Sequence, residues 1–223
     1  MQVKLAIILI FWPFASVAEK LVRVSFDEIT ICYPKSYSPN TSFMDSILAP
    51  IKGELDDSSG QQLVYIPAQV IKNKVPEYSL SHANKYNPKV MHDINGIIYP
   101  LSTIEINGLS DNAWNIHKNI ESPIIYQDQK TDFYKVFTFK KEIGPWHLVK
   151  SAPVQNSNKP KAKDWYIGFC GKLADSYNCK VNVVYKDIVY NYSLNEHNVS
   201  LYKQVQEVLL GEIKSWENAC PES

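Results

Sequence analysis

Apolar positions recur with strand-like periods along most of the chain. β-Branched and alternating runs predict strands at 21–34, 62–67, 96–106, 133–139, 146–152, 164–170 and 179–194. The last of these ranges is a predicted hairpin with its turn at Lys186-Asp187. Because short turns join successive strands, the sheets are expected to be antiparallel.

Three segments have helical patterns instead. A helix is predicted at 42–51, with Ser42 as N-cap, and another at 68–75, between Pro67 and Pro76. The longest is predicted at 196–219, with a capping box formed by Ser193 and Glu196. Its apolar stripe consists of Val205, Leu209, Ile213 and Trp216. A stripe of this width is expected to pack on the preceding sheet, so the predicted fold class is α+β, with antiparallel sheets and a C-terminal amphipathic helix.

The first 18 residues have the three-part pattern of a secretory signal peptide. Lys4 provides the positive charge, residues 5–14 are apolar, and Ser16 and Ala18 are small residues at the expected cleavage site. The apolar run is shorter than the ~20 residues that span a bilayer. We therefore expect a periplasmic or secreted protein, cleaved near Ala18 and without a membrane span.

A change of composition near 107–131 divides the remaining chain. It predicts an N-terminal α+β half at 19–130 and a C-terminal half at 131–223 with a sheet and one helix. One continuous domain is the alternative.

The four cysteines are expected to form disulfide bonds, because an even number in an exported chain is typical of disulfides. Zinc-type CxxC spacing and a redox CxxC are both missing from the sequence. Cys170 and Cys179 would face each other across a predicted strand pair, which leaves Cys32 to pair with Cys220. Two other pairings remain formally open.

Charge and motifs exclude several function classes. The formal net charge is zero and Arg23 is the single arginine, so nucleic-acid binding is not expected. The sequence has no GxSxG or HExxH motif after the signal peptide, and neither a catalytic site nor a cofactor is predicted. His82 and His92 are ten residues apart with Asp93 beside the second, a spacing that matches no metal motif, so no metal site is predicted. The alternative is an exported hydrolase with an unmarked site around these three residues.

Four segments are similar to periplasmic immunity proteins that protect bacteria from type VI secretion phospholipase effectors. They are LVYIPAQVIKNKVPEY, WYIGFC, YNCKVNVVYKDIVYNYSL and LYKQVQEVLLGEIKSW. The resemblance implies an exported, non-enzymatic inhibitor that occludes the active site of a lipase-like toxin. An envelope-associated structural or binding module is the other alternative.

A protein-binding role in a neutral chain would depend on aromatic anchors rather than on a long-range field. Turns present such anchors most easily. The candidates for partner binding are Tyr37 and Phe43 in one proline-containing segment and Trp114 in the polar stretch. Binding should then weaken only modestly as salt is raised.

Overall fold

The computed structural model describes residues 20–26, 28–39, 60–101, 106–139, 142 and 144–221. The strands in these ranges are β1 Leu21–Phe26, β2 Ile29–Pro34, β3 Gln62–Ile66, β4 Ser81–His82, β5 Val90–Met91, β6 Ile94–Pro100, β7 Ile125–Gln127, β8 Tyr134–Phe137, β9 Trp146–Val149, β10 Tyr166–Leu173, β11 Ser176–Tyr185 and β12 Ile188–Asn195. The helices are α2 Ala68–Lys74, α3 Ile106–Trp114, α4 Ile116–Asn119, α5 Ala162–Trp165 and α6 Tyr202–Asn218, with 3-10 turns η1 Lys35–Tyr37 and η4 Val199–Leu201. The expected signal peptide at 1–18 and the helix expected at 42–51 lie outside the described residues.

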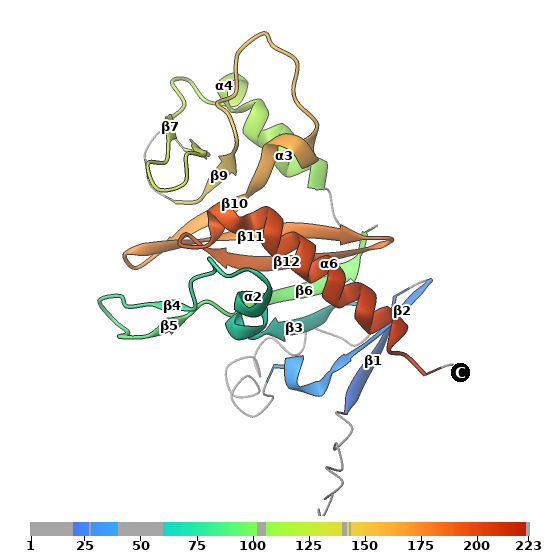
Figure 1. Cartoon of the computed structure of the whole chain (residues 1–223). Helices are drawn as coiled ribbons and strands as arrows, with labels where there is room; N and C mark the ends of the chain where they lie inside the picture. Colours follow the sequence, from blue (N-terminus) through green and yellow to red (C-terminus); the bar gives the residue numbers. More distant parts are fainter. Residues whose placement is uncertain are drawn as a thin grey trace, which may run out of the picture.

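One large antiparallel sheet organises the chain (Figure 1). Within the described residues it contains eight strands in the order β3-β6-β12-β11-β10-β9-β8-β7. This confirms the predicted α+β class with antiparallel sheets. The sheet crosses the expected boundary at 130/131, because β6 pairs with β12. That pairing fits the alternative of one continuous domain.

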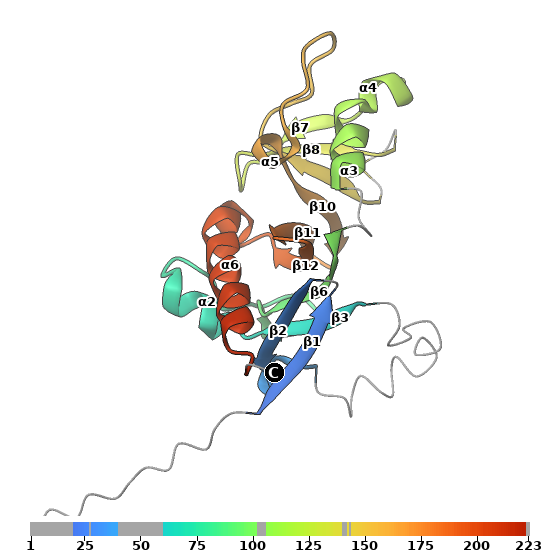
Figure 2. The same cartoon turned by 90° about the vertical axis from the view of Figure 1, so that its right-hand side faces the viewer.

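Helix α6 packs on the central strands, on the same face as α2 (Figure 2). Its buried side chains include the predicted stripe of Val205, Leu209, Ile213 and Trp216, which confirms the expected docking on the sheet. The predicted capping box is wrong. Ser193 still belongs to β12, Glu196 forms an ion pair with Lys130 at 2.6 Å, and the helix begins only at Tyr202, after η4.

The predicted strand at 21–34 is two strands instead of one. β1 and β2 form a hairpin that pairs Phe26 with Ile29, where the polar Asp27 and Glu28 interrupt the apolar run of the sequence. The hairpin forms a separate two-stranded sheet and packs against the end of α6. Tyr33 of β2 lies 5.8 Å from Trp216, measured between ring centroids.

Both expected disulfide bonds are present. Cys170 and Cys179 are directly paired neighbours on β10 and β11, with Cα atoms 3.9 Å apart. Cys32 of β2 is bonded to Cys220, just after α6. The second bond therefore fastens the N-terminal hairpin to the C-terminal helix, and the paired cysteines are consistent with an oxidising compartment.

The polar stretch at 107–131 has more regular structure than its composition suggested, since it contains α4, β7 and most of α3. A small second core lies between these helices and the sheet; its buried members are Ala113, Trp114, Ile116, Val136, Val149 and Trp165. Trp165 ends α5, so the strand predicted at 164–170 begins two residues later, at Tyr166. The sequence pattern did not predict these helices, because only one side of each is buried and most of their residues are polar.

Candidate functional site

Three histidines from three different segments meet beside the large sheet. His82 belongs to β4, His92 follows β5, and His197 lies between β12 and α6. Their ring centroids are 4.9 to 5.4 Å apart, and one ring nitrogen of each lies within 4.8 Å of the others. We call these three residues the histidine cluster.

His92 is the buried and most strongly held member, with 3% of its surface exposed. Its Nδ1–H donates to the backbone oxygen of Ser79 at 2.8 Å. Asn198 fixes that peptide from the other side, because its side chain accepts from the Ser79 N–H at 2.7 Å and donates to the Ser79 oxygen at 2.9 Å. A backbone oxygen can only accept, so the proton of neutral His92 lies on Nδ1, and Nε2 carries a lone pair that can accept a hydrogen bond or bind an ion.

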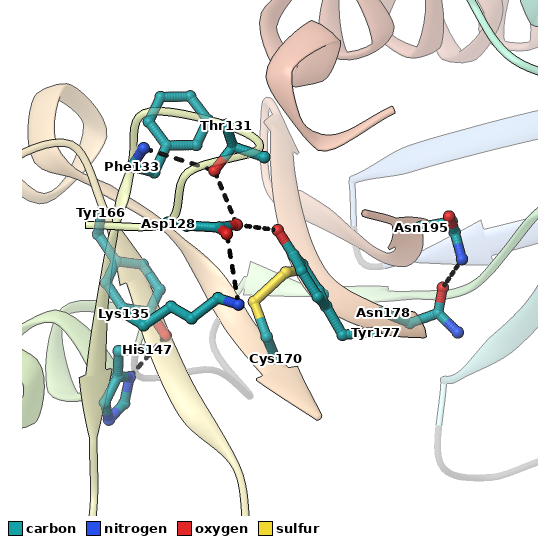
Figure 3. The surroundings of a disulfide bond; sticks show 11 residues. Asp128, Thr131, Phe133, Lys135, His147, Tyr166, Cys170, Tyr177, Asn178 and Asn195 are labelled. Carbon is teal, nitrogen blue, oxygen red and sulfur yellow. Dashed lines mark hydrogen bonds and ion pairs between the residues drawn. A yellow bond between two sulfur atoms is a disulfide. The ribbon is translucent and has the colours of Figure 1, made fainter. Parts of the chain in front are cut away.

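His197 is oriented in the same way by a side chain. Its Nδ1 lies 2.7 Å from Oδ1 of Asn195, which also accepts from the His197 backbone N–H at 3.1 Å. Asn195 is held in turn by Asn178, to which its amide donates at 3.2 Å (Figure 3). The Nδ1 proton of His197 is used in this hydrogen bond, so Nε2 is the nitrogen with a lone pair available to a ligand. His197 is exposed and gives the cluster access to solvent.

His82 completes the cluster through a short contact. Its Nδ1 lies 2.6 Å from Nε2 of His92, and because that atom carries no proton, His82 Nδ1–H is the donor. The other nitrogen of His82, Nε2, is buried and has no hydrogen-bond partner. A buried acceptor without a partner is uncommon in proteins and indicates an absent ion, water or ligand.

His92 and His197 both favour the neutral imidazole, because their surroundings lower the pKa of each ring. Burial lowers the pKa of His92, and the nearby rings of His82 and His197 lower it further, against the opposing effect of the Ser79 oxygen. Burial also lowers the pKa of His197, although the carboxylate of Glu196 acts in the opposite direction. Both rings therefore stay unprotonated near neutral pH and keep a lone pair for a ligand.

A hollow of about 190 Å³ adjoins the cluster. Its walls include His82, His92 and amide or hydroxyl side chains of β11 and β12, such as Asn178 and Ser193. Asp93 also lines it, but its Oδ1 accepts from the backbone N–H of Ala68 at 2.7 Å and so holds the start of α2. His82, His92 and Asp93, the residues of the alternative hydrolase hypothesis, thus lie in one neighbourhood, and His197 is the member that sequence reasoning missed.

A second hollow, of about 460 Å³, lies next to the first, and the two share Ser176 of β11. We call it the aromatic hollow, because its lining includes four rings, those of Tyr126, Phe137, Trp146 and Tyr177. Lys135 reaches over three of the rings, with Nζ 4.6 Å from the Tyr177 centroid, 5.1 Å from that of Trp146 and 5.9 Å from that of Tyr126. Such contacts combine apolar surface with charge.

Asp128 is buried and holds two residues of this hollow, Tyr177 and Lys135, in place (Figure 3). It accepts hydrogen bonds from Tyr177 Oη at 2.7 Å and Thr131 Oγ1 at 3.0 Å, and Lys135 Nζ lies 3.5 Å away. Burial would raise the pKa of Asp128, but the hydrogen bond from Tyr177 and the charge of Lys135 outweigh it and lower the pKa. Asp128 thus stays ionised and fixes Tyr177 and Lys135.

The residues expected to bind a partner have different surroundings. Trp114 is 8% exposed and lies edge-on to Trp165 at 5.1 Å, so it belongs to the second core and the prediction of an exposed anchor is corrected. Tyr37 is half-buried, 6.0 Å from the Trp216 ring, which leaves its proposed role in binding a prediction. Phe43 lies outside the described residues.

His147 is a buried histidine apart from the cluster. It belongs to β9, packs against Phe169 and lies 3.0 Å from the hydroxyl of Tyr166. Burial lowers the pKa of His147 to about 4. In the unfolded chain this histidine binds a proton below about pH 6.5, whereas in the folded chain it does so only below about pH 4. The free energy of unfolding therefore falls as the pH drops from about 6.5 to about 4.

We expect this histidine to contribute up to about 3 kcal/mol to the loss of folding free energy between pH 7 and pH 4. Urea denaturation of the wild type and His147→Gln at both pH values measures it. The variant should lose less stability on acidification. If both proteins lost the same folding free energy between pH 7 and pH 4, the pKa of His147 would be the same in the folded and the unfolded chain.

No known protein family matches the chain, and no curated protein or solved structure shows significant similarity to it. Among the described residues, no helix is both long and apolar enough to cross a membrane.

Proposed function

We propose that this chain is an exported, non-catalytic inhibitor that binds another protein. Its partner is a secreted lipase-type toxin whose active site it occludes, as an immunity protein does. Export is supported by the signal-peptide pattern of residues 1–18 and by the two disulfide bonds.

The observation that carries this proposal is one surface that combines exposed apolar side chains with hollows. Tyr86 lies between β4 and β5 and is 75% exposed, and Met91 on β5 is 45% exposed. The β4–β5 hairpin projects from the body of the molecule on the side where the β10–β11 turn also projects (Figure 1). Met91 lines the hollow of about 190 Å³ beside the histidine cluster, which we call the small hollow. It shares Ser176 with the aromatic hollow. We call the hairpin and the two hollows the recognition face.

The chemistry of the recognition face suits a protein partner. Its aromatic hollow is bordered by charges of both signs, such as Lys172, Asp175 and Glu196. Aromatic anchors surrounded by polar groups are typical of residues that dominate protein–protein affinity. A projecting hairpin with an aromatic side chain also fits the entrance of a concave active site.

The test is inhibition of a secreted phospholipase by the disulfide-bonded protein, with any lipase-type toxin encoded by a neighbouring gene as the first partner tried. The wild type should inhibit the toxin and co-elute with it. Tyr86→Ser should weaken binding about tenfold or more, while thermal stability stays unchanged, because the exposed ring packs little in the free protein. Val154→Ser is the matched control, since Val154 is 57% exposed on a loop outside the recognition face.

Raising salt from 50 to 500 mM should weaken this binding only modestly. Absence of inhibition would reject the proposed function. Inhibition that is insensitive to Tyr86→Ser but is lost in salt would place the interface elsewhere and make it electrostatic.

The histidine cluster favours a second candidate function, an exported hydrolase acting at the small hollow. Three imidazoles beside an accessible cavity can hold or move protons. Ester hydrolysis by the purified protein that disappears in His92→Gln would support it. Hydrolysis that persists in that variant would exclude the cluster as its site.

A further inference from the structure

We propose that His82, His92 and His197 bind one divalent transition-metal ion of the zinc class. The inference goes beyond inhibition of a partner and does not depend on it. It places the ion between the β4–β5 hairpin and the turn that leads from β12 into α6.

The donor atoms select the class of ion. Imidazole nitrogen suits Zn²⁺, Cu²⁺ and Ni²⁺, whereas Mg²⁺ and Ca²⁺ prefer oxygen ligands. The one carboxylate of the adjoining hollow close to His92, that of Asp93, is already hydrogen-bonded to Ala68. Three histidines with a place for a fourth ligand form a common zinc arrangement.

The surroundings prepare the ligands for an ion. A ligating histidine usually donates its other N–H to a carbonyl or carboxylate, which fixes the ring and its tautomer. His92 has this arrangement through the Ser79 oxygen, and His197 has it through Asn195. In both rings Nε2 is the nitrogen left for the ion, and Asn198 and Asn178 hold the two acceptors in place.

His82 supplies the third position. Its Nδ1 shares a proton with Nε2 of His92 at 2.6 Å. A metal ion takes the place of that proton, which moves to Nε2 of His82 so that the ring stays neutral. Nδ1 of His82 and Nε2 of His92 then become ligands of the same ion. Zn–N bonds of about 2.0–2.1 Å in tetrahedral geometry place ligand nitrogens about 3.3 Å apart, so the two rings must separate by about 0.7 Å.

The hairpin can absorb this adjustment. β4 and β5 have two residues each and pair only with each other among the described strands. His92 is the anchored ligand, because Tyr78 Oη donates to its backbone oxygen at 2.6 Å. The ion would therefore shift His82 slightly away from His92 and link the hairpin to a fixed point on the body of the protein.

The fourth coordination position would face the hollow of about 190 Å³ lined by Asn178, Ser193 and Asn195. Water or a small polar ligand fits a cavity of this size and polarity. Exposed His197 provides the entry route. The site is thus of the open kind, in which an exchangeable ligand completes the coordination.

The experiment uses tag-free, disulfide-bonded protein that has been dialysed against a chelator. Isothermal titration with Zn²⁺ at pH 7.5 should show one saturable site per chain, and binding should raise Tm. Co²⁺ should give the visible absorption of tetrahedral coordination. Affinity should fall at pH 5.5, where protons compete for the imidazoles.

Two variants and one control assign the ligands. His197→Ala removes an exposed ligand and should weaken Zn²⁺ binding about 100-fold without loss of folding. Asn195→Ala leaves all three histidines in place and should weaken binding about 10- to 100-fold, as removal of a supporting hydrogen bond does. His117→Ala changes a histidine of α4 outside the cluster and should bind as the wild type does.

Lack of saturable binding by folded wild type, or equal affinity in the wild type and His197→Ala, would overturn the proposal. Metal binding without inhibition of the toxin would support the metal site and reject the proposed function. Inhibition without metal binding would do the reverse.

Discussion

Replacing both Cys32 and Cys220 with alanine should lower the free energy of unfolding by up to about 5 kcal/mol on the chain-entropy estimate. This bond closes a loop with a sequence separation of 188, and it joins Cys32 within β2 to Cys220, two residues after the end of α6. Without it, the unfolded chain gains the freedom to separate its two ends. Equilibrium urea denaturation under non-reducing conditions measures the change.

The matched control is the double variant Cys170→Ala/Cys179→Ala, which opens a loop with a sequence separation of only 9. Its expected cost is smaller, about 3 kcal/mol, because closing a short loop removes less conformational entropy from the unfolded chain than closing a long one. Thiol titration of the denatured wild type should find no free cysteine. Equal stability of the wild type and the Cys32/Cys220 variant would show that the terminal hairpin is already fixed by packing.

Replacing Trp216 with alanine should cost about 3–5 kcal/mol, because a large buried side chain is removed and the site collapses only in part. Trp216 is 3% exposed and joins α6 to the hairpin through Tyr33 and to the following turn η1 through Tyr37. Urea denaturation with the disulfides intact measures the loss. Trp216→Phe should lose less, because it keeps a ring in the cavity.

Lys214→Ala is the control on the same helix. Lys214 is exposed, and both residues favour helix, so its effect should stay within about 0.5 kcal/mol. If Trp216→Ala were as stable as Lys214→Ala, the contact between α6 and the hairpin would contribute little to the fold. The two cysteines nearby make this a test of packing, since the covalent link remains in the variant.

Sequence patterns predicted the fold class and most elements, because strands and helices with one buried face have a clear period. The β11–β12 hairpin with its Lys186-Asp187 turn and the apolar stripe of α6 were both predicted in this way. Patterns failed where the local signal was weak. The β1–β2 turn is marked only by Asp27-Glu28, and α3 and α4 have few apolar residues.

The two disulfide bonds were predicted from the sequence for a different reason. Export predicts oxidation, and only four cysteines are present. Cross-strand placement of Cys170 and Cys179 then left Cys32 and Cys220 as the other pair. Trp114 shows the limit of such reasoning, because an aromatic residue in a polar stretch can be either a surface anchor or the centre of a small core.

The sequence alone thus predicted most strands of the large sheet, the amphipathic helix and a preferred cysteine pairing among three, because these depend on local periodicity and on counting. Only the tertiary structure decided the candidate sites. His197 is 105 positions after His92, and sheet order rather than any spacing rule brings it to His82 and His92. The recognition face likewise combines β4–β5 with β7–β11, because neighbours in a folded sheet need not be neighbours in the chain.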